Sequence, residues 1–369
     1  MLKRFEVENF RGFEKHLVFD LTARDYDFNK ELVHDGVVNK GIVYGKNGIG
    51  KSNLGVALFD IVSHLTDKEK MPSIYLTPYL NLNSGKEFAE FKYCFQFDRD
   101  EVVYEYRKQN VNFLIDEKLT INGKLVLYRH YFKPEGNFMD EEFAKGLNVE
   151  LIDNRLSVLK YIYRNTPTNP ESPFQKMMVF VDNMLWYRGL SEGNAYSGFT
   201  NGGASLVEGL YAHGKKAEFE RFLKDNGLDY KLEWRDNNGL HELLAVFPSG
   251  KRAPFLSIAS TGTKSLLLYF FWSMEAFDKI SLLFIDEFDA FFHYESAANI
   301  VIRLNRNRRF QTFLTSHNTY LMNNKFTRPD CCFIMTENKI TNLFDSTDKE
   351  IREAHNLEKM YRNGAFHDQ

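Results

Sequence analysis

The feature that most constrains this chain is residues 45–52, which read GKNGIGKS and match the phosphate-loop pattern G-x-x-x-x-G-K-[ST]. The loop follows the apolar residues 41–44 and opens a helical pattern. Its glycines let successive backbone N–H groups point inward, and the helix N-terminus adds a favourable dipole, so such a loop surrounds phosphate groups. We therefore expect a nucleotide site in which Lys51 reaches the β- and γ-phosphates and Ser52 binds Mg²⁺. The residues expected to contact nucleotide here are Gly45, Asn47, Gly48, Gly50, Lys51, Ser52 and Asn53.

The composition is that of a chain able to bury a large core. Its 369 residues are 43% hydrophobic and 26% charged, which allows one large domain or two intertwined ones. A net charge of −3 gives no overall basic field of the kind that marks a nucleic-acid binder, although a local basic patch stays open.

Cysteine usage and hydropathy indicate the compartment. The three cysteines, Cys94, Cys331 and Cys332, give neither a disulfide framework nor a metal-binding spacing, which favours a reducing compartment. The N-terminus lacks the long apolar stretch of a signal peptide, and no apolar run approaches the roughly 18 to 20 residues that span a bilayer. We expect a cytoplasmic protein that does not associate with membranes.

The N-terminal residues predict a hairpin. Residues 2–10 and 17–21 read as two strands at the edge of a nucleotide-binding core, with Arg11 in the turn between them. If the first strand runs beside the phosphate loop, Arg11 contacts nucleotide; otherwise it is a solvated turn residue.

After the phosphate loop, the spacing of apolar residues changes from that of a helix to that of strands. Residues 53–66 place apolar side chains at helical spacing. Residues 88–97 and 102–106 then alternate aromatic and polar side chains, and Asn122-Gly123 is typical of a tight hairpin turn. We expect an antiparallel sheet inserted after the first helix.

The middle of the chain, from about residue 135 to 226, predicts helices, and a short pair of strands follows it. No internal repeat or coiled-coil heptad run is present. The expected helices lie at 156–163 and 206–223, the surface loops at 166–173 and 193–203, and the strands at 228–232 and 240–247.

The last third returns to an alternation of strands and helices. Residues 257–263 lead into an apolar helix over 264–277. Residues 281–285 form a short continuous apolar run, which is typical of a buried parallel strand, and the run ends at Asp286-Glu287. A helix over 298–304 and a strand over 310–315 follow, and the strand ends at Ser316-His317-Asn318.

The pair Asp286-Glu287 has the chemistry of a second nucleotide motif. The first carboxylate can hold Mg²⁺ beside Ser52, and the second can orient and deprotonate an attacking water. An acidic pair can also merely cap the next helix at its N-terminus. The complete phosphate loop upstream favours the catalytic interpretation.

Two further groups fit a phosphate but also have ordinary structural interpretations. Ser260, Gly262 and Thr263 precede a helix and offer hydroxyls, exposed amides and a helix dipole to a γ-phosphate, although alone they read as a helix cap. His317 can hydrogen-bond the γ-phosphate or the water, but a lone histidine at a strand end is more often a turn residue.

The order of these motifs resembles that of ABC-type ATPase domains. Residues 9–13 (NFRGF) and 45–53 (GKNGIGKSN) are similar to the RecF and SMC branch of these ATPases. Other matches resemble the compact AAA-fifteen relatives of that branch, a group of AAA family ATPases found in bacterial anti-phage defence loci. These matches are residues 260–263 (STGT), 285–289 (IDEFD), 315–318 (TSHN), 328–330 (RPD) and 356–364 (NLEKMYRNG).

The resemblance implies an ATP site shared between two subunits. In the implied head-to-tail dimer, ATP bound by Lys51 and Ser52 of one subunit is covered by Ser260 and Gly262 of the other. The resemblance also implies roles for three residues at strand ends: Asp286 holds Mg²⁺, Glu287 is the general base and His317 senses the γ-phosphate.

Three departures from the family pattern bear on the rate of hydrolysis. Residues 259–263 (ASTGT) stand where the family has L-S-G-G-Q/E, and residues 292–294 (FHY) lack the proline common after the histidine. The glutamine of the Q-loop has only Gln96 as a weak candidate. We expect slow hydrolysis, with nucleotide acting chiefly as a dimerisation switch.

The predicted fold class is α/β: a P-loop NTPase with an ABC-ATPase-type head, an antiparallel β-subdomain and a helical insertion. Residues 1–130 are expected to hold the N-terminal part of the core with the phosphate loop and the antiparallel subdomain. Residues 131–250 are expected to be a mainly helical insertion or lid. Residues 251–369 are expected to complete the core with the signature, the Asp-Glu strand and the histidine loop.

The resemblance favours one biological role over two others. The favoured role is an ATPase sensor, scaffold or switch of a bacterial anti-phage defence system, forming homo-oligomers and holding a separately encoded effector such as a nuclease. The alternatives are a RecF-like DNA-repair ATPase and a nucleotide-gated binding module with little hydrolysis. Contact with nucleic acid or a partner stays open through one basic cluster, which is also typical of a helix C-terminus: Arg303, Arg306, Arg308 and Arg309.

Overall fold

The structure is a computed structural model that describes residues 1–68, 77–150, 152–167, 169–189, 195–200, 205–337 and 339–366. Two seven-stranded sheets, a three-stranded sheet and a two-stranded ribbon make up its β-structure. No helix within these ranges is long and apolar enough to cross a bilayer. Part of the predicted loop at 193–203, and Thr168 in the loop at 166–173, lie outside the described residues.

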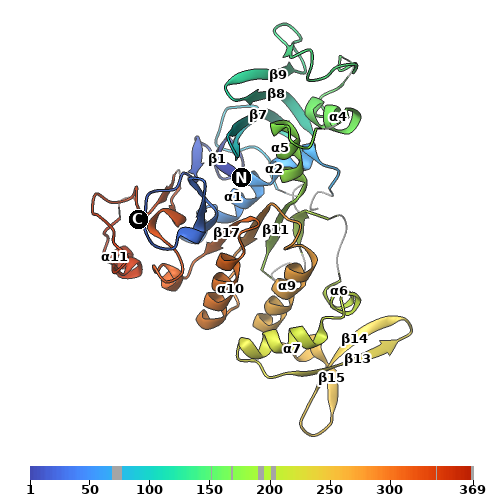
Figure 1. Ribbon diagram of the computed structural model, residues 1–369, viewed down its shortest axis with the longest axis vertical. Helices are drawn as coiled ribbons and strands as arrows, with labels where there is room; N and C mark the ends of the chain where they lie inside the picture. The colour runs from blue at the N-terminus through green and yellow to red at the C-terminus, as the bar shows by residue number, and fades with distance from the viewer. Residues whose placement is uncertain are drawn as a thin grey trace.

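The first sheet is antiparallel and has the order β10-β9-β8-β7-β6-β1-β2 (Figure 1). Alternate residues of its strands are buried, which is why aromatic and polar side chains alternate along them. The predicted hairpins are confirmed: β1 pairs with β2, and Asn122 and Gly123 both have positive φ in the β8–β9 turn. The strands are β1 (Leu2–Glu8), β2 (Leu17–Asp20), β6 (Ala89–Phe97), β7 (Asp100–Asn110), β8 (Phe113–Ile121), β9 (Lys124–His130) and β10 (Phe138–Met139).

The second sheet has the order β12-β11-β16-β17-β5-β18-β19, and its five inner strands are parallel. Strands β5, β16, β17 and β18 are buried on both faces, which the continuous apolar runs of β16 and β18 predict. Strands from both ends of the chain, together with β11 and β12 from its middle, thus lie in one sheet. The strands are β5 (Lys40–Tyr44), β11 (Met184–Arg188), β12 (Tyr196–Gly198), β16 (Leu282–Asp286), β17 (Gln311–Ser316), β18 (Cys332–Met335) and β19 (Ile340–Asn342).

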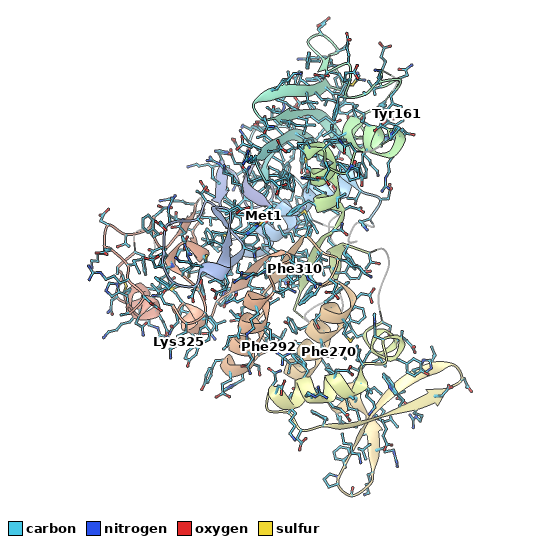
Figure 2. The ribbon with its side chains drawn as sticks, in the orientation of Figure 1. Met1, Tyr161, Phe270, Phe292, Phe310 and Lys325 are labelled. Carbon is cyan, nitrogen blue, oxygen red and sulfur yellow. The ribbon has the colours of Figure 1, made fainter. Side chains whose placement is uncertain are left out.

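Two hydrophobic cores lie on opposite faces of the parallel sheet. Val43 and Phe284 pack into the core shared with the antiparallel sheet, whereas their neighbours Ile42 and Leu283 pack into the other core. Phe270 of helix α9 and Phe310, directly before β17, both lie in this second core (Figure 2).

Helices cover both faces of the parallel sheet (Figure 1). Helices α1, α2 and α5 lie between the two large sheets, and α9 and α10 lie side by side on the other face. The helix predicted over 53–66 is divided at Phe59 into α1 and α2. The helices named here are α1 (Lys51–Leu58), α2 (Asp60–Leu65), α5 (Pro173–Asp182), α9 (Thr261–Glu275) and α10 (Tyr294–Arg306).

The middle of the chain differs from the predicted helical insertion. Strand β11 belongs to the core sheet, although its short apolar run cannot be told from a helix by periodicity. The helix expected over 206–223 is interrupted where Gly214 adopts a φ of 62°. The other elements here are α4 (Val158–Asn165), α6 (Leu206–Ala212) and α7 (Lys216–Asp225).

A small sheet projects from the end of the molecule remote from the antiparallel sheet (Figure 1). It contains β13 (Lys231–Asn237), β14 (Leu240–Val246) and β15 (Arg252–Pro254), so its last strand lies beyond the predicted boundary at residue 250. Helix α8 (Phe255–Ile258) then leads directly into α9. The remaining elements are the two-stranded ribbon of β3 (Val33–His34) and β4 (Val37–Val38), the C-terminal helix α11 (Leu357–Arg362), and the 3-10 turns η1 (Lys30–Leu32), η3 (Thr319–Leu321) and η4 (Pro329–Cys331).

Candidate functional site

The phosphate loop joins β5 to α1 and holds its own lysine. Gly48 and Gly50 have φ values of 78° and 107°, which side chains other than glycine rarely adopt. The Nζ atom of Lys51 donates hydrogen bonds to the carbonyl oxygens of Gly45 at 2.7 Å and Lys46 at 3.0 Å. Lys51 is buried, and burial lowers its pKa against the opposing effect of nearby carboxylates. The loop therefore presents an ammonium group already aimed along its inner surface.

The turn at residues 9–13 packs against this loop. An added Cβ at Gly50 would lie 3.1 Å from the Phe13 ring, and one at Gly12 would lie 3.0 Å from Nδ2 of Asn53. Arg11 in the same turn has a φ of 48°, and its backbone N–H donates to the carbonyl of Tyr79 at 3.0 Å. Burial lowers the pKa of the Arg11 side chain, so it is not the fully solvated turn residue of the second interpretation. Its contact with nucleotide stays a prediction.

Asp286 ends strand β16 and is fully buried. Its Oδ1 accepts a hydrogen bond from Thr315 Oγ1 at 2.6 Å, and the same Oγ1 accepts one from the backbone N–H of Glu287 at 2.7 Å. Glu287 adopts a φ of 50°, an uncommon conformation for a side chain of this size and one that clusters at functional sites. Thr315 on the neighbouring strand thus fixes both members of the acidic pair.

His317 follows β17 and meets the phosphate loop. Its Nδ1 lies 3.1 Å from Nζ of Lys51. Burial and the positive charge of Lys51 lower the pKa of His317 below 6.5, so the ring is neutral at pH 7 and Nδ1 accepts a hydrogen bond from the ammonium group. The structure therefore brings together Lys51, Asp286, Glu287 and His317, which are far apart in the sequence.

Asp289 is a third carboxylate near the site. It belongs to the motif at residues 285–289, but the sequence predicted no role for it. Burial raises its pKa to about 6, and the hydroxyl of Ser316 donates a hydrogen bond to its Oδ2 at 2.7 Å. Asp289 thereby joins the turn after β16 to the residue directly before His317.

Arg188 is a site residue that no sequence pattern identified. It ends strand β11 opposite Asp286 in the parallel register, and its Nη2 donates to Glu287 Oε1 at 2.8 Å. In the sequence, Arg188 directly follows the short apolar run 184–187. This pattern indicates a site residue only when the run is known to be a strand of the central sheet. Gln96, the weak Q-loop candidate, instead donates to the carbonyls of Asp98 and Asp100 within the β6–β7 hairpin.

The residues predicted to cover a second nucleotide lie at the start of α9. Ser260 is exposed and caps the helix, and its Oγ accepts from the backbone N–H of Thr263 at 3.2 Å. An added Cβ at Gly262 would lie 2.6 Å from the carbonyl oxygen of Phe291, so this corner packs against the turn after β16. The cap interpretation is therefore correct for one chain, and coverage of a partner's nucleotide stays a prediction.

The motif at residues 328–330 and the basic cluster at residues 303–309 both form ion pairs with structural roles. Arg328 and Asp330 form a buried ion pair, with Nε donating to Oδ1 at 2.7 Å, and both bond the backbone of Arg24. In the basic cluster, Arg303 pairs with Asp225 at 2.8 Å and Arg309 pairs with Asp278.

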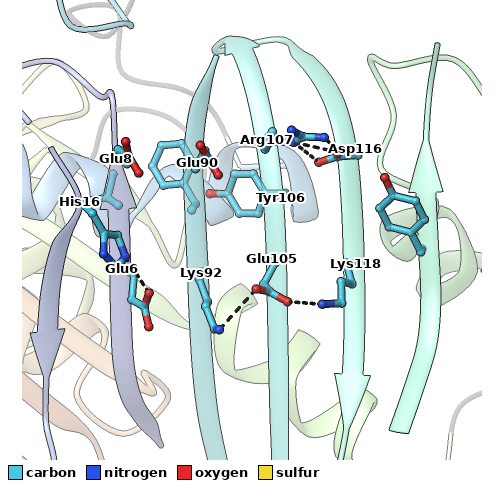
Figure 3. Close-up of a pocket in the computed structure, with 13 residues that line it drawn as sticks. Glu6, Glu8, His16, Glu90, Lys92, Glu105, Tyr106, Arg107, Asp116 and Lys118 are labelled. Carbon is cyan, nitrogen blue, oxygen red and sulfur yellow. Dashed lines mark hydrogen bonds and ion pairs between the residues drawn. The ribbon is translucent and has the colours of Figure 1, made fainter. Parts of the chain in front are cut away.

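A separate concave surface of about 510 Å³ lies on the outer face of the antiparallel sheet (Figure 3). Lys92 and Lys118 both pair with Glu105, at 3.4 Å and 3.0 Å, and Arg107 pairs with Asp116. These charges satisfy one another, and the phosphate loop is not part of this lining.

The residues present fit a Mg²⁺ ion. Asp286 Oδ2 is buried, accepts no hydrogen bond from any residue that the structure describes, and has the Arg188 guanidinium 3.4 Å away. Within the same ranges, no group of three His, Cys, Asp or Glu side chains could hold a metal alone. Mg²⁺ commonly binds through one or two protein side chains and the phosphates of its substrate. Asp286 and the half-buried Ser52 are suited to that arrangement.

Comparison with solved structures gives several full-length likenesses. The SMC head domain from Thermotoga maritima is 15% identical, with a TM-score of 0.45 and coverage of 92% of this chain and 98% of that one. The Smc head domain with an extended coiled coil, bound to the C-terminal domain of ScpA, from Pyrococcus furiosus is 11% identical, with a TM-score of 0.47 and 98% coverage of both chains. The recombination mediator protein RecF with ATP is 15% identical, with a TM-score of 0.40 and coverage of 93% and 99%.

Comparison by sequence identifies the family. No curated protein matches the chain. A family profile described as "AAA domain, putative AbiEii toxin, Type IV TA system" matches residues 42–323, about three quarters of the sequence. This match and the strand order confirm the predicted α/β nucleotide-binding fold. The chain therefore belongs to this family of AAA domains.

Proposed function

We propose that the chain binds ATP with Mg²⁺ and hydrolyses it to ADP and phosphate. The observation that carries the proposal is the convergence of Lys51, Glu287 and His317 at the carboxyl ends of neighbouring parallel strands, beside a buried Asp286. In open α/β sheets, ligands bind outside the carboxyl ends of the strands. Phosphoryl transfer needs mainly positioning and charge stabilisation, which these side chains supply.

Each residue has a distinct part in the proposed reaction. The loop amides and Lys51 bind the phosphates, while Ser52 and Asp286 hold Mg²⁺, which neutralises phosphate charge when bound. Glu287 orients a water molecule and accepts its proton as the water attacks the γ-phosphorus and the bond to the ADP oxygen breaks. His317, neutral at pH 7, hydrogen-bonds the γ-phosphate.

A second copy of the chain completes the proposed site. Ser260 is exposed, and Gly262 stands at the N-terminus of a fifteen-residue helix, where backbone N–H groups and the helix dipole favour an anion. In one chain this corner contacts the turn after β16. If this corner covered the ATP of a partner chain, the exposed hydrogen-bond donors of residues 260–263 would bind that nucleotide. The two chains would then associate only when nucleotide is bound.

The test of hydrolysis is Glu287→Gln. We expect ATP binding to persist and turnover to fall by about 100-fold or more, because the amide cannot accept the proton of the water. Glu275→Gln is the matched control, since Glu275 lies on the surface of α9 and pairs with His213. Unchanged turnover in Glu287→Gln would show that the general base is misassigned.

For the biological role, we propose a sensor or scaffold of a bacterial defence system that holds a separately encoded effector such as a nuclease. The family description names a putative toxin of a Type IV toxin–antitoxin system, which agrees with a function shared between separately encoded gene products. The product of a neighbouring gene should co-purify with the chain in an ATP-dependent manner. Tight binding to DNA with a steep dependence on salt, and no such co-purification, would favour the repair role instead.

A further inference from the structure

The placement of Arg188 carries an inference that rests on the proposed ATPase function. Strand β11 runs parallel to β16, and their register sets Arg188 opposite Asp286. The guanidinium group reaches both carboxylates of the acidic pair: Nη2 lies 2.8 Å from Glu287 Oε1, and Nε lies 3.4 Å from Asp286 Oδ2. Arg188 therefore contacts the two groups assigned to the metal and the water.

The contact with Asp286 falls on the oxygen that Mg²⁺ needs. Oδ1 of Asp286 is already occupied by the Thr315 hydroxyl at 2.6 Å, which leaves Oδ2 as the oxygen able to face a metal ion. A cation and the guanidinium group repel each other at one carboxylate oxygen. Binding of the metal with a nucleotide therefore favours movement of the Arg188 side chain toward another anion.

The backbone around Arg188 is fixed, so that movement is confined to the side chain. The Gly189 N–H donates to the carbonyl of Asp286 at 3.1 Å, and an added Cβ at Gly189 would lie 3.1 Å from the carbonyl oxygen of Glu287. Trp186 packs on the phosphate-loop helix, where an added Cβ at Gly55 would lie 2.6 Å from its Nε1. Tyr187 stacks on Trp272 of α9, with ring centroids 6.1 Å apart.

The strand order determines which phosphate can receive the guanidinium. Lys51 follows β5, and β17 and β16 lie between β5 and β11. Neighbouring strands are about 4.8 Å apart, so the three spacings between β5 and β11 separate the backbones that carry Lys51 and Arg188 by roughly 14 Å. Both side chains extend into that interval. In the proposed site the loop holds the inner phosphates, so we expect the terminal phosphate of a triphosphate to extend toward β11.

We infer that Arg188 senses the γ-phosphate of the bound nucleotide. Its guanidinium group leaves Asp286 and Glu287 and binds the terminal phosphate of ATP. ADP lacks this phosphate and offers the guanidinium group no equivalent partner. A guanidinium group suits this role because its fixed fork can bind two phosphate oxygens at once. Release of Glu287 from its ion pair then frees that carboxylate for the water only when a triphosphate is bound.

The test compares the affinities of a non-hydrolysable β,γ-imido ATP analogue and of ADP, both with Mg²⁺, by calorimetry. We expect Arg188→Ala to weaken binding of the triphosphate by roughly tenfold or more, the value of a charged hydrogen bond, while ADP affinity stays within about threefold or improves. Arg303→Ala, which removes a surface arginine paired with Asp225, should change neither affinity.

A parallel loss of both nucleotides in Arg188→Ala, or an unchanged ratio of the two affinities, would overturn the inference. If Arg188→Ala does not fold, Arg188→Gln keeps most of the side-chain volume without the charge and should show the same selective loss. Failure of the unaltered chain to bind the triphosphate analogue would refute the proposed ATPase function instead, so the two failures are distinguishable.

Discussion

The Nζ atom of Lys51 lies 3.1 Å from Nδ1 of His317, so that a residue of the phosphate loop and a residue 266 positions later form one hydrogen bond. The ring is neutral at pH 7 because burial and the charge of Lys51 lower its pKa. The bond therefore has a defined direction, from the ammonium group to the imidazole. It joins the parts of the site that come from opposite ends of the chain.

His317→Ala should lower ATP turnover by about 100-fold, because the γ-phosphate loses a hydrogen-bonding partner and Lys51 loses its neighbour. ADP affinity should change by no more than about threefold, since the inner phosphates keep the loop. Turnover and nucleotide titration on the same preparation measure both effects. His293→Ala, at an exposed histidine after β16, is the control. Turnover equal to that of the control would remove His317 from the mechanism.

Asp289→Asn should stabilise the folded chain at high pH. The pKa of Asp289 is raised from 3.8 to about 6, so ionisation is less favourable in the folded state. The folded chain therefore loses stability as the pH rises through about 6 and keeps it below the unfolded pKa. The gain in unfolding free energy should reach about 3 kcal/mol at pH 8 and fall below about 1 kcal/mol near pH 4. Urea denaturation at the two pH values measures it, and an equal gain at both would contradict the assignment.

Lys108→Met should destabilise the chain by about 3–5 kcal/mol, because it leaves the buried Asp60 without its cation. Nζ of Lys108 lies 2.9 Å from Asp60 Oδ2, and both residues are almost fully buried beside the phosphate-loop helix. Adding Asp60→Asn to the variant should restore much of the loss, since no charge is then left unpaired. Lys118→Met, which breaks an exposed pair with Glu105, should cost about 1 kcal/mol or less. Equal costs for the two lysines in chemical denaturation would be contrary to this reading.

Local patterns were sufficient to predict the parts of the site that lie at strand ends. Residues 45–52 predicted a phosphate loop, and the run ending in Asp286 predicted a buried strand. Few other structures have this glycine spacing or such a short continuous apolar run. The structure then placed Lys51 and His317 in contact. The cap interpretation of residues 260–263 is confirmed, since a serine cap has a local signature, but α9 begins at Thr261 and not at the predicted residue 264.

Features that depend on distant packing could not be predicted in the same way. Strand β11 reads locally like a continuation of α5, and only its pairing with β16 gives Arg188 its place beside Glu287. Gln311 is a second example. Its side-chain amide bonds both backbone polar groups of Leu2 and so ties the two sheets together across the length of the chain. No sequence period reports such a contact.

The central claim, that each ATP lies between two chains, is tested most directly by mixing two inactive variants. Lys51→Ala removes the phosphate-binding lysine, and Ser260→Arg blocks the corner proposed to cover the partner's nucleotide. In a mixed dimer, one site combines the intact loop of one chain with the intact Ser260 of the other. Each variant alone should be inactive, and an equal mixture should recover up to about a quarter of the normal ATP turnover. A mixture that recovers no turnover, although the chains associate, would contradict the shared site.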